Sequence, residues 1–321
     1  MSFDLLAQQP KLLYLLQGVG AFAAVVCLVL LVLHRGPARG GGAAVLLLAP
    51  ALLLLTAGLL LPALRTLMLS FTDDEGTAWV GLDNYAWTLT DPGALLALRN
   101  TLIWVVLVPL LVTAVGLLYA VAVARSRLRS PALCLLLLPM AMSFVGAGLI
   151  WKFVYAYRPA GADQIGLLNQ LVVAFGGEPR QWLVDAPWNV LFLVVAMVWT
   201  QAGFAAVLLT AAIRAVPGEL TEAARLDGAR PRQVFRYVTL PVIRPALLVV
   251  VLAEAIGTLK AFDIVKTMTA GRFGTGVLAH EMYDQAFRYG RTGRGAALAV
   301  LLFALVTPVV AHQVRARRSA R

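Results

Sequence analysis

Seven long apolar runs restrict how this chain can fold more than any other feature of its 321 residues. A helix needs about 20 apolar residues to cross a hydrocarbon core of roughly 30 Å, and each run is close to that length. Only 13% of the residues are charged, whereas an ordinary soluble domain has about 25%. We therefore predict an all-α polytopic membrane protein with about seven transmembrane helices. The runs are Leu12–Leu33, Ala44–Leu69, Thr101–Ala124, Pro131–Tyr155, Val190–Ile213, Pro245–Phe262 and Gly295–Gln313.

The placement of basic residues predicts which side of the membrane each loop occupies, because arginine and lysine concentrate in cytoplasmic loops. If residues 34–43, 125–130, 214–244 and 314–321 share one side, that side holds 15 of the 27 basic residues and 3 of the 16 acidic residues. On the opposite side, 12 basic residues are balanced by 12 acidic ones. We expect the amino terminus to lie outside the cell and the carboxyl terminus in the cytoplasm. The net charge of +11 is thus a topology signal rather than a nucleic-acid footprint.

Few residues of the chain suit a metal site or a catalytic centre. Cys27 and Cys134 lie in separate apolar runs, which excludes a CxxC pair, and the three histidines, His34, His280 and His312, are scattered. None of the four lysines follows a glycine, as the P-loop pattern GxxxxGK[ST] requires. We therefore predict no catalytic residue, no metal ligand and no bound cofactor in this chain, and no ATP hydrolysis by it.

The segment Pro217–Pro241 is a polar interruption that reads as two short helices with a turn between them. Proline at an early position and acidic residues near the positive end of the dipole favour a helix that starts at Pro217. Gly228 can take the positive φ that a turn requires. A second helix starts at Pro231, and Leu240–Pro241 is expected to end it just before the next span.

The pattern Glu-Ala-Ala, then Asp-Gly-Ala, then Phe and finally Leu-Pro in this segment resembles the signature loop of permeases of binding-protein-dependent ABC importers. The resemblance implies that the segment docks into a cleft on an ATP-hydrolysing subunit. Glu222 would then meet a basic side chain there, Gly228 would make the bend, and Ala223 and Ala224 would keep the helix slim. The ATPase-coupling residues predicted in this way are Glu222, Ala223, Ala224, Asp227, Gly228, Phe235, Leu240 and Pro241.

Three further stretches resemble the carbohydrate-importing branch, and within it the α-glucoside and glucosylglycerol permeases. They are "WVGLDNY" (residues 79–85), residues 141–159 and residues 262–288. Residues 44–321 would form a type I importer permease core, with 214–244 as its coupling loop, and residues 1–43 an additional span and linker. The implied partners are a second permease in a heterodimer, two ATPase subunits that bind ATP and magnesium, and an extracytoplasmic sugar-binding protein, all at the bacterial inner membrane. The transported solute would be a sugar, an α-glucoside or a related oligosaccharide or compatible solute.

A sugar pathway needs hydrogen-bonding groups and aromatic faces within the spans. In maltose-type permeases, which this chain resembles, a substrate-lining tryptophan precedes the coupling glutamate, and Trp199 stands at the corresponding distance before Glu222. In the same permeases a second substrate-lining helix follows the coupling loop. Glu254 also stands out on physical grounds, because a carboxylate within a span usually faces a cavity or a partner. The main alternative to a pathway role for Glu254 is a structural ion pair with an arginine of the second permease. Packing and an interhelical hydrogen bond are the alternatives for Trp199 and Gln201. The predicted substrate pathway comprises Trp199, Gln201, Phe204, Glu254, Gly257 and Thr258, with Ser143 and Trp151 as weaker candidates.

Two other functions are weighed against this one. A membrane-embedded transferase would use Asp73, Asp74 and Glu75 to hold a metal, although a solvated charge run explains this trio as well. A secondary transporter driven by an ion gradient would account for Glu254 but not for the coupling loop. Co-purification of an ATPase would separate the importer from both alternatives.

Overall fold

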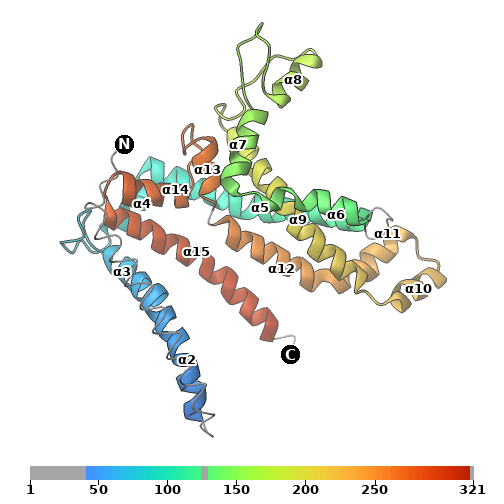
Figure 1. Ribbon diagram of the computed structural model, residues 1–321, viewed down its shortest axis with the longest axis horizontal. Coiled ribbons are helices and arrows are strands. Elements are labelled where there is room, and N and C mark those ends of the chain that lie inside the picture. The colour runs from blue at the N-terminus through green and yellow to red at the C-terminus, as the bar shows by residue number, and fades with distance from the viewer. Residues whose placement is uncertain (1–40, 124–128, 260, 319–321) are drawn as a thin grey trace, which may run out of the picture. The chain divides into compact units, whose positions relative to one another are not determined.

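The computed structural model describes residues 41–123, 129–259 and 261–318, and these residues are mainly helical (Figure 1). Within them no strand forms beyond a single antiparallel bridge between Thr72 and Trp79. The helices are α2 (Gly41–Leu55), α3 (Leu61–Leu69), α4 (Asp83–Thr90), α5 (Pro92–Val123), α6 (Arg129–Leu137), α7 (Phe144–Val154), α8 (Leu167–Ala174), α9 (Asn189–Arg214), α10 (Gly218–Leu226), α11 (Pro231–Val234), α12 (Leu240–Thr258), α13 (Asp263–Met268), α14 (Leu278–Tyr283) and α15 (Thr292–Arg318). The predicted all-α class is confirmed.

The chain divides into two compact units, residues 1–68 and 69–321. In the first unit, α2 and α3 are joined by the π-helical turn Thr56–Leu60. Residues Leu48–Leu69 are long and apolar enough to cross a membrane, as predicted. Taken by itself, α3 has no buried residue. Its apolar side chains are therefore available to lipid or to another membrane helix.

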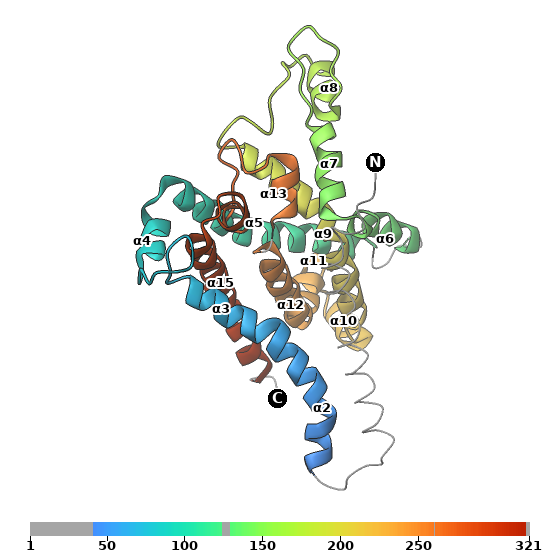
Figure 2. The ribbon, with the colours of Figure 1, turned by 60° about the vertical axis from the view of Figure 1, so that its left-hand side comes forward.

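The core of the second unit is a bundle of the long helices α5, α9 and α12, which lie side by side in Figures 1 and 2. Small residues let these helices approach closely. A Cβ at Gly116 of α5 would lie 2.5 Å from Cβ of Ala205 in α9, and a Cβ at Gly203 would lie 2.5 Å from the Leu136 carbonyl of α6. Close backbone approach through small residues is the usual packing mode of membrane helices, because lipid offers no hydrophobic drive for association.

The predicted span Pro131–Tyr155 is broken into two helices. Residues 134–141 and 144–154 meet at an angle of 105°. Pro139 opens a short 3₁₀ turn at the break, and Ser143 starts α7 as its N-cap, because its hydroxyl accepts a hydrogen bond from the Gly146 N–H at 3.1 Å. The helix α7 thus leaves the bundle steeply and carries α8 at its far end (Figures 1 and 2). Ser143, a weaker pathway candidate, has a capping role.

Buried side-chain amides of α5 and α9 hold the loop 269–277 in place. The Asn100 side chain donates to the carbonyls of Gly274 and Gly276 at 2.7 and 2.9 Å. Asn189 donates to the Phe273 carbonyl at 2.7 Å. Both amides are fully buried. These bonds satisfy carbonyls of the loop 269–277, whose turns include a positive φ at Gly271 and Gly274.

The described residues contain four helices that can cross a membrane, or five if the bent pair counts as one span. The span predicted at Thr101 starts nine residues earlier, at Pro92, and the span predicted at Pro245 is the end of a longer helix from Pro231 to Thr258. The last predicted span lies within α15, whose apolar part is Thr292–Pro308. The first, Leu12–Leu33, falls outside the described residues.

Candidate functional site

The polar interruption forms a helix-turn-helix whose bend is fixed by backbone hydrogen bonds. The amide of Ala229 donates to the Ala224 carbonyl at 2.9 Å, and the amide of Gly228 donates to the Arg225 carbonyl at 3.0 Å. This pair of bonds is a Schellman motif, which requires a left-handed residue after the helix. Gly228 supplies it with a φ of +82°. The predicted turn at Gly228 is confirmed, and it is a stable geometry rather than a loose loop.

The first helix of this segment, α10, has no buried residue. Glu222 and Ala223 are exposed and Ala224 is half-buried. Leu226 is 88% exposed and Leu220 is 47% exposed. A short helix with an acidic group, two alanines and uncovered leucines has the composition of a docking element, because isolated helices of this length are marginal in water without a partner. In Figure 1, α10 lies beyond the ends of α9 and α12.

The second helix does not end at Leu240–Pro241, which corrects the sequence prediction. Residues Pro231–Val234 continue through the π-helical turn Phe235–Thr239 into α12. Pro241 follows the π-helical turn directly, and such a local adjustment lets a continuous membrane helix accommodate a proline. Phe235 and Leu240 are half-buried and Pro241 is exposed. The segment after the bend is therefore continuous with a membrane helix.

Three of the predicted pathway residues form one polar group between α9 and α12. The Gln201 amide donates to the Glu254 carboxylate at 3.4 Å, and the Thr258 hydroxyl donates to the Glu254 main-chain carbonyl at 2.6 Å. Glu254 and Thr258 are each only 2% exposed. No ion pair reaches the Glu254 carboxylate from any described residue. A buried carboxylate with one amide partner is unusual inside a span and marks a functional or pairing role.

Trp199 lies on another face of α9, and this arrangement divides the predicted pathway set. Two residues along a helix correspond to about 200° of rotation, so Trp199 and Gln201 point in nearly opposite directions. The Trp199 ring packs edge-on against Trp151 of α7, with centroids 5.8 Å apart. Trp151 in turn contacts Tyr155, and the row of rings continues to Phe192 and Trp182 with centroid distances of 5.0 to 5.4 Å.

Trp151, which the sequence made only a weaker pathway candidate, is a central member of this aromatic row. It links Trp199 to the segment between α7 and α9 that contains Trp182. Its indole nitrogen is buried without a hydrogen-bond partner among the described residues. The repeated aromatics at 151, 155 and 192 were a visible signal for this row. Phe204 is half-buried, and its position three residues after Gln201 places it near that face. Gly257 is half-buried and faces open space, because a Cβ there would meet nothing within 4 Å.

Two members of the acidic trio at residues 73–75, Asp73 and Asp74, are engaged in local structure. The Thr77 backbone N–H donates to Asp73 at 2.7 Å, and this bond lowers the pKa of the Asp73 carboxyl. The Asp74 carboxylate pairs with Arg294 and Arg291 at 3.6 and 4.0 Å. Among the described residues, no group of three or more potential ligands could hold a metal ion. The two aspartates stabilise the start of α15 and the turn beside it.

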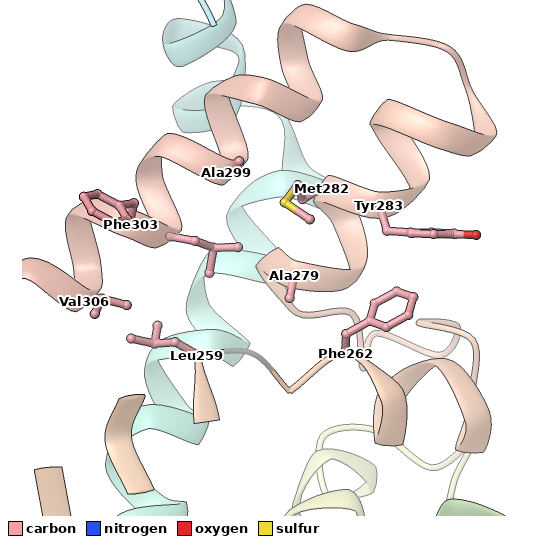
Figure 3. A pocket seen from close by; sticks show the side chains of 9 residues that line it. Leu259, Phe262, Ala279, Met282, Tyr283, Ala299, Phe303 and Val306 are labelled. Carbon is pink, nitrogen blue, oxygen red and sulfur yellow. The ribbon is translucent and has the colours of Figure 1, made fainter. Parts of the chain in front are cut away.

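An apolar cleft of about 390 Å³ lies between the end of α12, α14 and α15 (Figure 3). Its lining includes Leu259, Phe262 and Phe303. The Tyr283 hydroxyl, the one polar side-chain group in the lining, is directed away from the other side chains in Figure 3. A sugar needs hydrogen-bond partners, so this cleft does not suit one.

A bundle of membrane helices with an exposed helix-turn-helix at one end fits a membrane transport permease. Residues 97–319 match the family of binding-protein-dependent transport system inner membrane components, and the chain belongs to this family. The predicted membership is confirmed.

Two relatives and two solved structures agree with this assignment. The chain is 47% identical over 261 residues to the osmoprotective compounds uptake permease protein GgtC of Synechocystis sp., covering 81% of this chain and 94% of that protein. It is 45% identical over 262 residues to the alpha-glucoside transport system permease protein AglF of Rhizobium meliloti, covering 81% and 78%.

The fold resembles a chain of a bacterial ABC transporter involved in the import of the acidic polysaccharide alginate, with a TM-score of 0.74 at 20% identity, covering 85% of this chain and 94% of that one. It also resembles a chain of the MetNI methionine ABC transporter, with a TM-score of 0.52 at 19% identity, covering 72% and 99%. These similarities establish the importer permease fold.

Proposed function

We propose that this chain is the membrane-spanning permease of an ATP-driven ABC importer that moves a sugar or related compatible solute into the cytoplasm. The observation that carries the proposal is the helix α10, which has no buried residue and is joined by the rigid Gly228 bend to a helix that is long and apolar enough to cross a membrane. A rigid element seated on an ATPase can transmit rigid-body motion, whereas a loose loop would dissipate it.

The proposed assembly contains a second permease, two ATPase subunits and an extracytoplasmic solute-binding protein. ATP and magnesium would bind to the ATPase subunits. The basic residues around α10 and α11 support a cytoplasmic position for this face, with the amino terminus outside and the carboxyl terminus inside.

Within the membrane, the Gln201–Glu254–Thr258 group and the Trp199 face are the proposed contacts for the solute. The first offers hydrogen-bonding groups, and the second offers aromatic rings for the apolar faces of a sugar. We propose an α-glucoside or an osmoprotective glucoside as the solute, because the relatives at 45–47% identity are named for such compounds. Affinity at this site should be low, since a transported solute must leave it.

The ATPase contact is tested by placing a cysteine at Glu222 and cross-linking in cells that take up the solute. Capture of an ATPase subunit supports the proposal, and capture of none overturns it. Glu222→Lys should abolish the contact by placing like charges together, whereas Glu219→Lys, a change of equal charge on the same exposed helix, should have a smaller effect. Equal effects of the two variants would remove the specific role of Glu222.

The solute is tested by uptake of labelled α-glucosides and glucosylglycerol in a strain that lacks the gene and carries either the wild-type chain or Glu254→Gln. Uptake that depends on the chain identifies the substrate class. Glu254→Gln keeps the shape of the side chain and one acceptor oxygen but removes its charge. Unchanged uptake by Glu254→Gln together with unchanged uptake by Trp199→Ala would exclude both proposed contact faces.

A further inference from the structure

A large pocket of about 1,010 Å³ lies at the end of α5 that is near α11 and the π-helical turn. Its lining combines apolar and basic side chains: Val121, Pro231, Arg232, Gln233, Phe235, Arg236, Tyr237 and Leu240. It is separate from the exposed α10 and from the buried Gln201–Glu254 group, since neither contributes a lining residue. Two of its lining residues, Phe235 and Leu240, are among the predicted coupling residues, but neither coupling nor transport accounts for the two arginines of the lining.

The charge of this pocket is uncompensated. Arg232 and Arg236 are four residues apart, and both are exposed. None of the lining residues is acidic, and neither arginine forms an ion pair with any residue that the structure describes. The three acidic residues of this face, Glu219, Glu222 and Asp227, lie on or at the end of α10, before the Gly228 bend. Two guanidinium groups beside a concave surface attract an anion, and their planar donors match the oxygens of a phosphate.

The position of the pocket relative to the membrane selects the kind of anion. Arg232 and Arg236 lie in the first turns of the helix Pro231–Thr258. Its 28 residues span about 42 Å, more than a hydrocarbon core of roughly 30 Å, so we place its first turns outside the core, beside the lipid headgroups. Tyr237 is 69% exposed, and the Arg236 guanidinium lies 5.9 Å from its ring centroid. Aromatic and basic residues together are typical of the membrane interface.

The apolar part of the lining lies on the side of the hydrocarbon core. Val121 belongs to the last turn of α5, and Leu240 begins α12. A ligand that spans both parts must have a charged head and an apolar tail. Basic pockets between membrane helices on the cytoplasmic side bind anionic lipid headgroups by this combination.

We propose that this pocket binds the phosphate headgroup of an anionic phospholipid, with Arg232 and Arg236 as its charged ligands and Val121, Phe235 and Leu240 against the first part of the acyl chains. The proposal rests on the membrane assignment of α5 and α12 and not on the identity of the sugar or on ATP coupling. A bound lipid would join α5 to the helix that follows the bend, next to the docking element.

The test uses the full-length chain, purified with its native partners in phosphatidylcholine nanodiscs into which phosphatidylglycerol is titrated. Native mass spectrometry measures the retained phosphatidylglycerol. Each single substitution, Arg232→Ala or Arg236→Ala, should weaken retention about five-fold and the double variant about thirty-fold. Arg214→Ala, an exposed arginine at the end of α9 outside the pocket, is the matched control and should change retention less than two-fold. Equal losses in all variants would overturn the proposal, because they would reflect the general surface charge.

A second measurement does not depend on the folding of the alanine variants. Phosphatidylglycerol with a photoreactive group near its headgroup is cross-linked to the wild-type chain, and the labelled peptides are mapped. Labels within residues 231–240 support the proposal, and labels confined to other segments overturn it. Arg232→Lys with Arg236→Lys, which keeps the charge but loses the planar donors, should retain part of the labelling.

Inorganic phosphate separates a lipid from a soluble anion as the source of the same chemistry. In nanodiscs without anionic lipid, phosphate at millimolar concentration should cause little stabilisation. Strong stabilisation by phosphate that the double variant abolishes would assign the site to a soluble anion and overturn the lipid proposal. The lipid proposal would also be overturned if a protein partner, and not lipid, protected the pocket from labelling.

Discussion

The Gly228 bend permits a prediction in which backbone strain is separated from steric clash. A Cβ at Gly228 would meet nothing within 4 Å, so a substitution there adds no contact. The cost comes from the φ of +82°, which an alanine adopts at a penalty of roughly 1–2 kcal/mol. The population of the bent state relative to an unbent one should thus fall by about 5- to 30-fold in Gly228→Ala. Gly228→Asn should cost less, because asparagine tolerates this region better, and Gly228→Val should cost more.

The assay compares ATPase co-purification and solute-stimulated ATP hydrolysis in proteoliposomes across this series. Gly218→Ala is the matched control: Gly218 lies in α10, its φ is not positive, and the nearest atom to an added Cβ is the Glu222 carboxylate at 3.9 Å. That change should leave coupling intact and favour the helix by up to about 1 kcal/mol. If coupling does not follow the order glycine, asparagine, alanine, valine, or if Gly218→Ala is as harmful as Gly228→Ala, the bend does not set the geometry of the contact.

Three further predictions concern packing, loop anchoring and pH. Gly116→Val should separate α5 from α9 and lower the melting temperature of the purified protein, since overpacking costs about 1–3 kcal/mol. Gly257→Ala, whose added Cβ meets no neighbour, should leave the melting temperature unchanged. Equal melting temperatures of the two variants would contradict this prediction. Asn100→Ala should leave the Gly274 and Gly276 carbonyls without their donor, and each unsatisfied carbonyl costs about 1–3 kcal/mol of stability. The loss should appear as faster amide hydrogen exchange confined to residues 269–277. Unchanged exchange would refute the anchoring role.

Burial lowers the pKa of His280 below its ordinary value of 6.5. The charge of Asp284 opposes this shift, and the charges of Lys266 and Arg288 add to it. Because the unfolded state then binds the proton more tightly, the stabilising contribution of neutral His280 is complete above pH 6.5 and is lost as the pH falls from there toward the folded-state pKa. Melting temperatures between pH 7.5 and 5 should fall more in the wild type than in His280→Phe, and parallel curves would contradict this account.

Local sequence rules were sufficient where one residue type decided the structure. Gly228 predicted the bend because no other residue takes a positive φ at so small a cost, and Pro217 and Pro231 marked the helix starts. The break after Pro139 was harder to foresee, because proline within an apolar run also fits a kinked continuous helix. The Ser143 cap was the available signal that a new helix starts there.

Side-chain direction and tertiary contacts explain the remaining differences. Trp199 and Gln201 are close in sequence but face α7 and α12 respectively, and only the packing of three helices reveals that Gln201 reaches Glu254. The continuation of the second helix through Leu240–Pro241 depends on a π-helical turn, which has no reliable local sequence pattern. The hydrogen-bond partners of the buried Asn100 and Asn189 could not be predicted from the sequence, because these partners lie 174 and 84 residues away along the chain.

The unbroken helix from Pro231 to Thr258 makes the Glu254–Gln201 bond sensitive to events at the opposite membrane surface. Its 28 residues span about 42 Å, and Glu254 lies about 14 Å from the midpoint, so pivoting by 10° around the midpoint displaces Glu254 by roughly 2–3 Å. A hydrogen bond of 3.4 Å between neighbouring helices does not survive a displacement of that size unless α9 moves in step. The carboxylate and the amide would then be exposed together, and a solute hydroxyl could take the place of the lost partner.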